Sequence, residues 1–296
     1  MHEETARPAE VAHTDDVIGE VPHWEAAAGR LWWIDILKPA LHRLDTASGE
    51  VRSWTPPEKL GSYGRRRDGT MVVGGRGGIA LWHPETGRFD RLSEPEADRP
   101  DNILNDGRVG PDGRFVIASM NKRLAGPTGR LWQVDGDGTT RCLQDGDIHL
   151  PNAICWSPDG ATMYLGDSHT NMIWQYDYDR ASGAIGNRRL FADTSDLPGD
   201  CDGASIDSEG FLWNARFGGA CLIRFAPDGR AERLLHLPVS QPTHVTFGGA
   251  DLATLYVTSG HFRLSDEVKA AEPMSGGLLA LPAPCPGLPE TPFAEG

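Results

Sequence analysis

The sequence of 296 residues contains few cysteines, and they do not form a recognisable pattern. The five are Cys142, Cys155, Cys201, Cys221 and Cys285. Their odd number, their wide spacing and the lack of a Cys-x-x-Cys pair argue against a disulfide framework and against a zinc site. We therefore expect reduced thiols that pack in the interior.

Positive charge and long apolar runs are also scarce. The chain has 28 Lys and Arg against 42 Asp and Glu, a formal net charge of -14. Proteins that bind nucleic acid neutralise phosphates with Lys and Arg, so we expect no nucleic-acid partner. No uncharged apolar stretch reaches the roughly 18 residues of a membrane span, and the first residues lack a signal-peptide pattern. These features predict a cytoplasmic protein without a membrane partner, either a monomer or a weak homo-oligomer.

No segment has the length and periodicity of a clear helix, but one strand-rich unit recurs six times. Each copy begins at a turn and continues into apolar strands; the copies start at Gly29, Gly69, Gly113, Gly160, Gly210 and Leu252. A spacing of about 40 to 50 residues is typical of a four-stranded propeller blade. The sequence thus predicts an all-β fold, a six-bladed β-propeller that forms one domain over residues 1–296.

Three further expectations follow from this fold. A propeller closes by pairing strands from its two ends, so residues 10–18 should supply a strand beside residues 278–281. The three Pro-Asp-Gly segments, at 111–113, 158–160 and 227–229, are expected to be hairpin turns. The proline-rich tail from Pro282 onward is expected to be irregular surface chain.

Polar residues recur at one position of the repeat, ahead of the apolar strand. They are Glu20, Asn105, Asn152 and Asp202. If the blades are equivalent, these side chains point toward one place, where their oxygens would suit Ca²⁺, Mg²⁺ or Mn²⁺ better than Zn²⁺. Taken singly, Asn105-Asp106-Gly107 and Asp202-Gly203 could be ordinary turns. Their register across four repeats favours a shared site.

Several phrases of the chain resemble one protein family. They are Gly19-Glu20-Val21-Pro22-His23-Trp24, the stretch from Asn102 to Phe115, Pro151-Asn152-Ala153 with the segment 156–160, and Cys201-Asp202-Gly203-Ala204 with the segment 207–213. Together they resemble the senescence marker protein, gluconolactonase and luciferin-regenerating enzyme family. The resemblance covers nearly the whole chain.

The resemblance implies one divalent metal ion, whether Ca, Mg, Mn, Zn or Fe, bound by Glu20, Asn152 and Asp202. Asn105 matches a residue beside the metal that contacts substrate. Members of the family hydrolyse lactones of aldonic acids, and others act on different esters or organophosphates. A bound dication polarises a lactone carbonyl, and Asp202 is our candidate for the base that takes a proton from water.

The chain departs from the family pattern at two positions that bear on the substrate. Ile103 stands where many lactonases have an arginine that contacts sugar hydroxyls, and Arg123 stands where regucalcin-like members often have an acidic residue. We expect Arg123, or one of Arg65, Arg66 and Arg67, to recognise a negative charge on the lactone. Solvated loop cations are the alternative interpretation.

Other polar side chains carry weaker expectations. Tyr63, His149, His244 and His261 are placed on loops that could line the same opening, with Tyr63 the one we assign to substrate binding. Glu25, Asp35 and Asp167 are expected to satisfy backbone groups at strand ends.

The function predicted from the sequence is that of a metal-dependent lactonase acting on a small-molecule sugar lactone. Two alternatives stay open: another esterase or organophosphatase using the same metal site, and a calcium-binding regulatory propeller.

Overall fold

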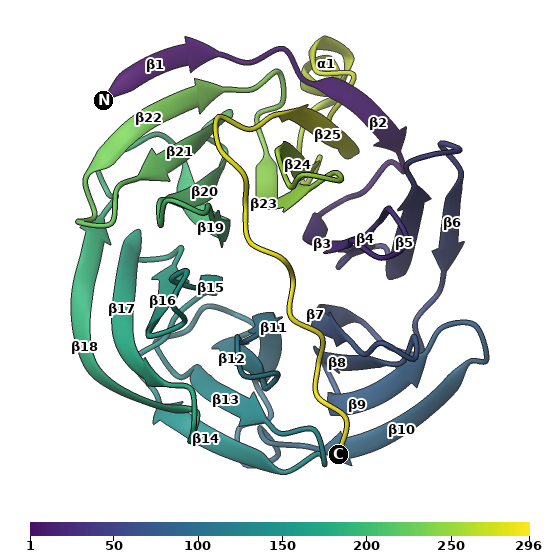
Figure 1. Cartoon of the computed structure of the whole chain (residues 1–296), viewed down its shortest axis with the longest axis vertical. Coiled ribbons are helices and arrows are strands. Elements are labelled where there is room, and N and C mark those ends of the chain that lie inside the picture. Colours follow the sequence, from purple (N-terminus) through teal and green to yellow (C-terminus); the bar gives the residue numbers. More distant parts are fainter. The chain divides into compact units, whose positions relative to one another are not determined.

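The computed structural model describes all residues from 1 to 296, and it contains 25 strands and one short helix. Contacts divide the chain into unit 1, residues 1–55 and 191–290, and unit 2, residues 56–190 and 291–296. Each unit contains three separate sheets (Figure 1). No helix has the length and apolar character that crossing a bilayer requires.

Unit 1 contains the first, fifth and sixth sheets of the chain. The first comprises β3 (Gly19–Glu25), β4 (Arg30–Asp35), β5 (Ala40–Asp45) and β6 (Val51–Trp54). The fifth comprises β19 (Asp200–Ile206), β20 (Leu212–Phe217), β21 (Cys221–Phe225), β22 (Ala231–His236) and an added strand, β1 (His2–Thr5). The sixth comprises β23 (Pro242–Gly248), β24 (Thr254–Ser259), β25 (Gly277–Pro282) and β2 (Ala9–His13).

Unit 2 contains the second, third and fourth sheets. The second comprises β7 (Leu60–Arg65), β8 (Met71–Gly75), β9 (Gly78–His83) and β10 (Arg88–Ser93). The third comprises β11 (Asn102–Val109), β12 (Phe115–Asn121), β13 (Arg130–Val134) and β14 (Thr140–Asp145). The fourth comprises β15 (Pro151–Trp156), β16 (Thr162–Asp167), β17 (Met172–Asp179) and β18 (Ala184–Asp193).

Five sheets have four strands each, and the remaining sheet has four strands with β1 added at its edge. This arrangement confirms the all-β, six-bladed β-propeller fold. The expected pairing of the two chain ends is also confirmed, because β2 pairs antiparallel with β25 and Glu10 stands opposite Leu279. The sequence did not predict β1, which pairs in parallel with β22 at the edge of the fifth sheet. The extent of a single domain over residues 1–296 stays a prediction.

The Pro-Asp-Gly segments are hairpin turns, as expected. Gly113, Gly160 and Gly229 all have positive φ, and each donates its N–H to the carbonyl three residues earlier. Glycine adopts this left-handed conformation without the steric penalty of a Cβ atom. The turns therefore reverse the chain between neighbouring strands of one sheet.

The core of each unit lies between the faces of adjacent sheets. In unit 2, Val116 and Leu131 of the third sheet pack with Ile154, Trp156 and Met163 of the fourth. In unit 1, residues of the fifth and sixth sheets form a comparable cluster that includes Trp213, Leu222, Val245, Leu255 and Leu279. The apolar faces that the strand patterns predicted are thus buried sheet against sheet.

Cysteine burial follows expectation in part. All five cysteines are free, and Cys155, Cys201 and Cys221 are buried, whereas Cys142 is exposed and Cys285 is half-buried. Burial raises the pKa of the Cys221 thiol to about 11, so this thiol stays protonated near neutral pH.

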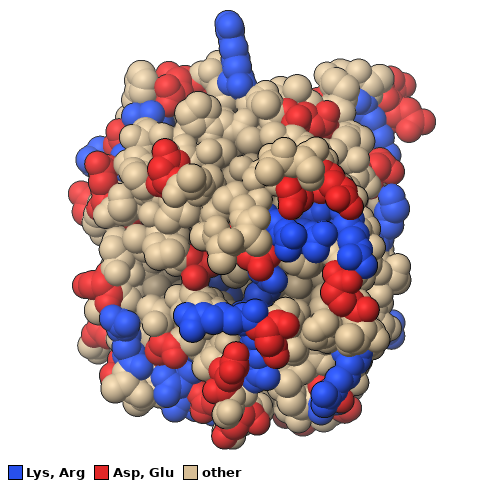
Figure 2. Space-filling model, turned by 45° about the vertical axis from the view of Figure 1, so that its right-hand side comes forward, with Lys and Arg blue, Asp and Glu red and all other residues tan.

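Figure 2 shows acidic and basic side chains interspersed on the face it presents. Many of them form ion pairs, such as Arg130 with Asp98.

Two segments differ from the expectation of irregular or strand-only structure. A six-residue helix, α1 (Asp266–Ala271), lies between β24 and β25, and the Ser265 side chain accepts a hydrogen bond from the Val268 N–H at its start. The tail after Pro282 is irregular, but it is not wholly at the surface. Phe293 is only 2% exposed, and its N–H donates to the Arg65 carbonyl at 2.7 Å.

Phe293 joins a buried cluster of unit 2 that contains Val72, Val109, Phe115 and Ile117. Arg66 covers the ring, with its guanidinium carbon 4.9 Å from the ring centroid. The tail is therefore part of the core of unit 2, because an aromatic ring of this size excludes much apolar surface from water.

We expect Phe293→Ala to lower the free energy of unfolding by about 3–5 kcal/mol, because it leaves a cavity in a packed cluster. Chemical denaturation measures this change. Glu295→Ala, two residues later and exposed, is the control and should change the value by less than about 0.5 kcal/mol. Equal stability of the two variants would show that the tail does not contribute to the core.

Candidate functional site

The first strand of every sheet contains a one-residue β-bulge near its beginning. The pairing register shifts between Glu20 and His23 in β3, and between Asn152 and Cys155 in β15. It shifts at the corresponding places in the other first strands: Leu60/Ser62, Leu104/Gly107, Cys201/Ala204 and Pro242/His244. A bulge leaves one residue unpaired and turns nearby side chains out of the regular alternation.

All four residues singled out from the sequence lie at these bulges. Glu20 and Asn152 are the last paired residues before the register shift, and Asn105 and Asp202 are the first residues inside it. The residues lie within strands and not on the loops ahead of them. The interpretation of Asn105-Asp106-Gly107 and Asp202-Gly203 as turns is therefore wrong.

The backbone is strained beside two of these residues. Val21 and Ala153 have φ values of 52° and 56°, and each follows a predicted metal ligand directly. Positive φ is rare for residues with a Cβ atom and is an outlier for a β-branched residue such as valine. Strain of this kind, about 1–3 kcal/mol per residue, is typical of binding and catalytic sites.

In unit 1, His244 contacts one predicted carboxylate ligand, Glu20, and the glycine that follows the other, Asp202. The imidazole Nδ1 is 3.0 Å from Oε2 of Glu20. The ring also lies against the Cα atom of Gly203, so closely that a Cβ atom there would overlap with it. The side chain is 3% exposed, and its buried Nε2 has no hydrogen-bond partner. The structure thus brings Glu20 and the Asp202-Gly203 bulge to one histidine.

A buried polar network supports the bulge that carries Asp202. Asn214 of β20 donates from Nδ2 to the carbonyls of Asp202 at 2.6 Å and Gly203 at 3.3 Å. Its Oδ1 accepts from the Arg216 guanidinium at 3.1 Å. Burial lowers the pKa of Arg216, and its other donors are used by backbone carbonyls and the Thr194 hydroxyl. The hydrogen bonds from Asn214 satisfy the carbonyls of Asp202 and Gly203, which the bulge leaves outside the regular pairing of β19 with β20.

In unit 2, the two predicted carboxamides are adjacent. Asn105 donates from Nδ2 to the Pro151 carbonyl at 3.0 Å, directly before Asn152. Asn152, 7% exposed, donates from Nδ2 to the Ser168 hydroxyl at 2.7 Å. In both residues the amide nitrogen is engaged, so Oδ1 is the atom left to bind a ligand. The neighbouring Asp106 carboxylate accepts from the Ile154 N–H at 3.1 Å and ties the two strands together.

Two buried aspartates organise the loops that lead into the bulged strands. Asp35 accepts from the N–H groups of Val17 and Ile18 ahead of β3, and from those of Leu37 and Lys38 after β4. In the fourth sheet, Asp167 accepts from the equivalent groups, those of His149, Leu150, His169 and Thr170. The expectation that these residues satisfy backbone groups is confirmed. Glu25 differs, since its carboxylate accepts from the Trp32 indole.

The structure corrects the placement of several substrate-binding candidates. Tyr63 is 2% exposed in the middle of β7 and not on a loop. Arg65, Arg66 and Arg67 lie at or beyond the end of β7 opposite its bulge, where Arg66 donates to the Gly136 carbonyl. They are not at the expected opening, because β7 runs away from the bulged end. Arg123 is exposed on the turn after β12, at the end of the third sheet where β11 begins.

The remaining histidines have separate surroundings. His149 stacks on His169 with 4.7 Å between ring centroids, and its Nδ1 lies 3.4 Å from Asp167. His261 lies 3.2 Å from the exposed Asp15 carboxylate. His244 is the one that contacts a predicted ligand. The sequence signal for it was available, since Gln241-Pro242-Thr243-His244 stands in register with the phrases that contain Glu20 and Asp202.

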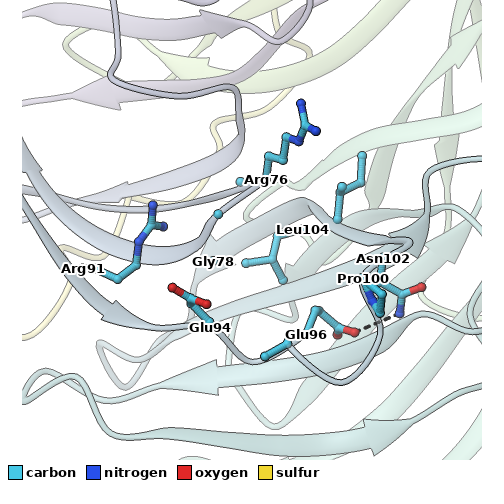
Figure 3. A pocket seen from close by; sticks show the side chains of 12 residues that line it. Arg76, Gly78, Arg91, Glu94, Glu96, Pro100, Asn102 and Leu104 are labelled. Atoms are coloured by element: carbon cyan, nitrogen blue, oxygen red, sulfur yellow. Dashed lines mark hydrogen bonds between the residues drawn. The ribbon is translucent and has the colours of Figure 1, made fainter.

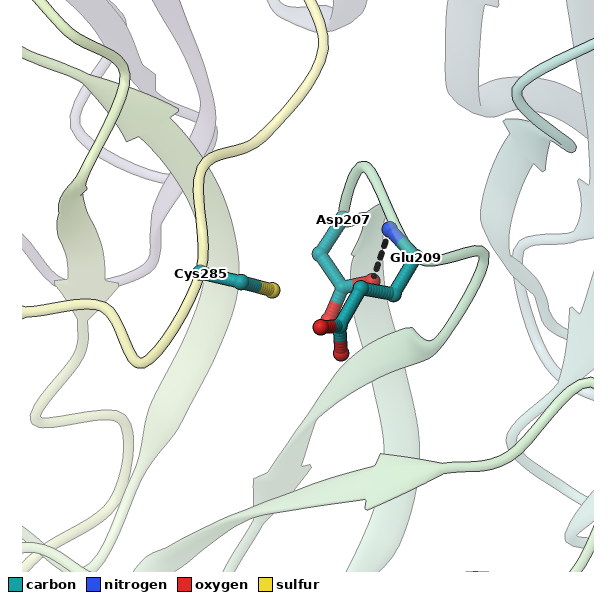
Figure 4. Close-up of side chains that lie close together, drawn as sticks. All are labelled: Asp207, Glu209 and Cys285. Atoms are coloured by element: carbon teal, nitrogen blue, oxygen red, sulfur yellow. Dashed lines mark hydrogen bonds between the residues drawn. The ribbon is translucent and has the colours of Figure 1, made fainter.

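A second acidic cluster lies away from these residues, at the far end of β19. Figure 4 shows Asp207, Glu209 and Cys285 pointing toward one another, with their ligand atoms within 4.8 Å. The Arg224 guanidinium already occupies this cluster, 2.7 Å from both carboxylates and 3.6 Å from the thiol. Burial raises the pKa of Cys285 to about 11, which keeps the thiol protonated. The cluster is an internal ion-pair network that holds the tail.

The close approach of Gly203 to His244 gives a test of this arrangement. We expect Gly203→Ala to destabilise the fold by about 1–3 kcal/mol, since the added methyl group displaces the imidazole. Denaturant unfolding measures the loss. Gly186→Ala, where no atom lies within 4 Å of the added Cβ, is the matched control and should be nearly neutral.

A double-mutant cycle then identifies the cause. Replacing His244 by Ser in the Gly203→Ala background should recover part of the loss, because the smaller side chain leaves room for the methyl group. If His244→Ser recovers nothing, the two residues are not in contact as described.

Comparison with known proteins places the chain in a family. Residues 18–261 match the model described as the SMP-30/Gluconolactonase/LRE-like region. The chain is 36% identical to 6-deoxy-6-sulfogluconolactonase of Pseudomonas putida over 285 residues, which cover 96% of this chain and 97% of that protein. It is 32% identical to L-arabinolactonase of Azospirillum brasilense, with 96% and 94% covered. A solved structure of a calcium-binding protein, regucalcin, from Agrobacterium tumefaciens matches with a TM-score of 0.94 at 30% identity, covering 99% of each chain. The chain belongs to the SMP-30/gluconolactonase/LRE-like family.

Proposed function

We propose that the protein hydrolyses a sugar-derived lactone to the open acid with the help of one bound divalent cation. Relatives that cover almost the whole chain are a sulfogluconolactonase and an arabinolactonase. The single observation that supports a cation best is the Glu20 carboxylate, which is 6% exposed and has no lysine or arginine partner. A buried carboxylate is costly without a compensating positive charge.

The donor set fits such an ion. Glu20, Asp202 and Asn152 would hold it, and each offers an oxygen at the bulge of a first strand. Oxygen donors of this kind suit hard cations such as Ca²⁺, Mg²⁺ or Mn²⁺. When bound, the cation supplies Lewis-acid polarisation of the lactone carbonyl and stabilises negative charge on its oxygen. Zn²⁺ and Fe²⁺ remain in the set to be tested.

The residues of the chain perform the proton transfer and the orientation of substrate. Asp202 takes a proton from the attacking water as the water oxygen bonds to the carbonyl carbon. The bond from that carbon to the ring oxygen then breaks, and the proton passes to the alkoxide that leaves. Asn105, whose Oδ1 is free, orients the substrate beside Asn152. Tyr63 and Arg123 are the further substrate contacts we propose, and a cytoplasmic location and a monomeric or weakly oligomeric state stay predictions.

Calcium binding without catalysis is the second candidate, favoured by the likeness to regucalcin. The two functions are separated by a panel of neutral and acidic five- and six-membered aldonolactones and aryl esters, followed with a pH indicator. Protein stripped of metal is compared with protein given Ca²⁺, Mg²⁺, Mn²⁺, Zn²⁺ or Fe²⁺. We expect metal-restored hydrolysis of a sugar lactone. No turnover with any metal, together with calorimetric Ca²⁺ binding, would favour the regulatory function.

Asp202→Asn tests the proposed base. We expect kcat to fall by about 10²- to 10⁴-fold, the usual contribution of general-base catalysis, while the circular dichroism spectrum is unchanged. Asp200→Asn, the same change at an exposed position two residues earlier in β19, should retain nearly full activity. Near-normal turnover by Asp202→Asn would rule out Asp202 as the base.

A further inference from the structure

Unit 2 contains a cavity of about 280 Å³ beside the residues assigned to substrate binding. Its walls are the turn between β8 and β9 and the segment that leads into β11 (Figure 3). The charged residues of the lining are Arg76, Arg91, Glu94 and Glu96, and Ile103 and Leu104 supply apolar surface. No part of the proposed reaction yet uses this cavity.

Two of the four charged residues, Arg91 and Glu96, already have hydrogen-bond partners. Arg91 forms a two-point ion pair with Glu58, at 2.6 and 3.1 Å. The hydrogen bonds that Arg91 donates to Glu58 raise the pKa of Arg91, and the nearby Glu94 carboxylate adds to this effect. Glu96 accepts hydrogen bonds from three groups, the Asn102 amide, the Ser119 hydroxyl and the Trp132 indole. Glu96 is therefore held by hydrogen bonds inside the wall, and Arg91 is neutralised by Glu58, whereas Glu94 acts on Arg91 only through its nearby charge.

Arg76 is different, because its guanidinium has neither a hydrogen bond nor an ion pair. The residue is exposed on the β8–β9 turn. Figure 3 shows its side chain extending away from Arg91 and Glu94. Arg76 is thus the one arginine of the cavity lining without a carboxylate partner, in a chain that carries a net charge of -14. Arg123, also exposed, does not line the cavity.

The cavity adjoins the bulge of β11. Ile103 lines it and stands two residues before Asn105, in the paired part of β11 that leads into the bulge. An isoleucine at position 103 offers no hydrogen bond to a sugar hydroxyl. It leaves space and an apolar surface, and Arg76 supplies the cation from the next sheet.

We propose that Arg76 binds an oxyanionic substituent, a carboxylate or a sulfonate, carried by the lactone at the end of its carbon chain away from the reacting carbonyl. A guanidinium binds both groups through two parallel hydrogen bonds. Ile103 lies beneath the carbon chain that joins this substituent to the ring next to Asn105. The protein is therefore selective for acidic sugar lactones, an inference that rests on the proposed lactonase function.

The test uses D-glucono-1,5-lactone and its counterparts with a carboxylate or a sulfonate at carbon 6. We expect Arg76→Ala to lower kcat/KM for the two acidic lactones by about 10-fold or more, mostly through KM. Turnover of the neutral lactone should change less than about 2-fold, since it lacks the charged group. Arg76→Lys should retain part of the selectivity, because it keeps the charge and loses the two-point geometry.

One exposed arginine serves as the matched control. Arg67→Ala removes an equal charge from the opposite end of the second sheet and should leave all three lactones unaffected. The proposal is overturned if Arg76→Ala affects neutral and acidic lactones equally, or if Arg123→Ala alone removes the selectivity. Failure of the wild-type protein to hydrolyse any lactone would instead overturn the proposed function, and this inference with it.

Discussion

The constraint on which the site depends is the bulge at the start of each first strand. In a regular ladder the successive side chains of each first strand would alternate between the two faces of the sheet, where the apolar packing between sheets lies. One extra residue per strand breaks this alternation directly after Glu20 and Asn152, and at Asp202. The chain tolerates the strain at Val21 and Ala153 because the surrounding ladders fix the strands on both sides.

The predicted donors divide by chemistry between the two units. Unit 1 holds the carboxylates, with His244 against Glu20 and Gly203, whereas unit 2 holds the carboxamides Asn105 and Asn152 beside one backbone carbonyl. Their supports differ accordingly. An imidazole contacts the Glu20 carboxylate and Asn214 holds the Asp202 backbone, whereas the carboxamides donate hydrogen bonds that fix the amide orientation and leave oxygen available.

Much of the fold and of the candidate site was predictable from the sequence, because the strand pattern recurs six times and a polar residue recurs near the start of four of the copies. The spacing of the copies predicted the number of sheets, and the recurrence of four polar residues placed each within one residue of the start of its blade's bulge. The repeat could not reveal what occurs once, such as β1, α1 or the burial of Phe293. From the sequence, Tyr63, Arg65, Arg66 and Arg67 were expected at a loop opening. This placement was wrong because β7 is short and contains small and polar residues, as a loop does. Asn214 and Arg216 gave no signal at all, since their roles arise only from the partner strand.

The pairing of β2 with β25 has a consequence for how the protein is made. The first of these strands leaves the ribosome long before the second, because almost all the other strands lie between them in the sequence. During the interval β2 lacks its native neighbour, and the edge of β25 does not yet exist to receive it. Contacts between segments so distant in sequence form slowly. Completion of the sixth sheet is thus a late event, and chains released before Pro282 would present an open strand to one another.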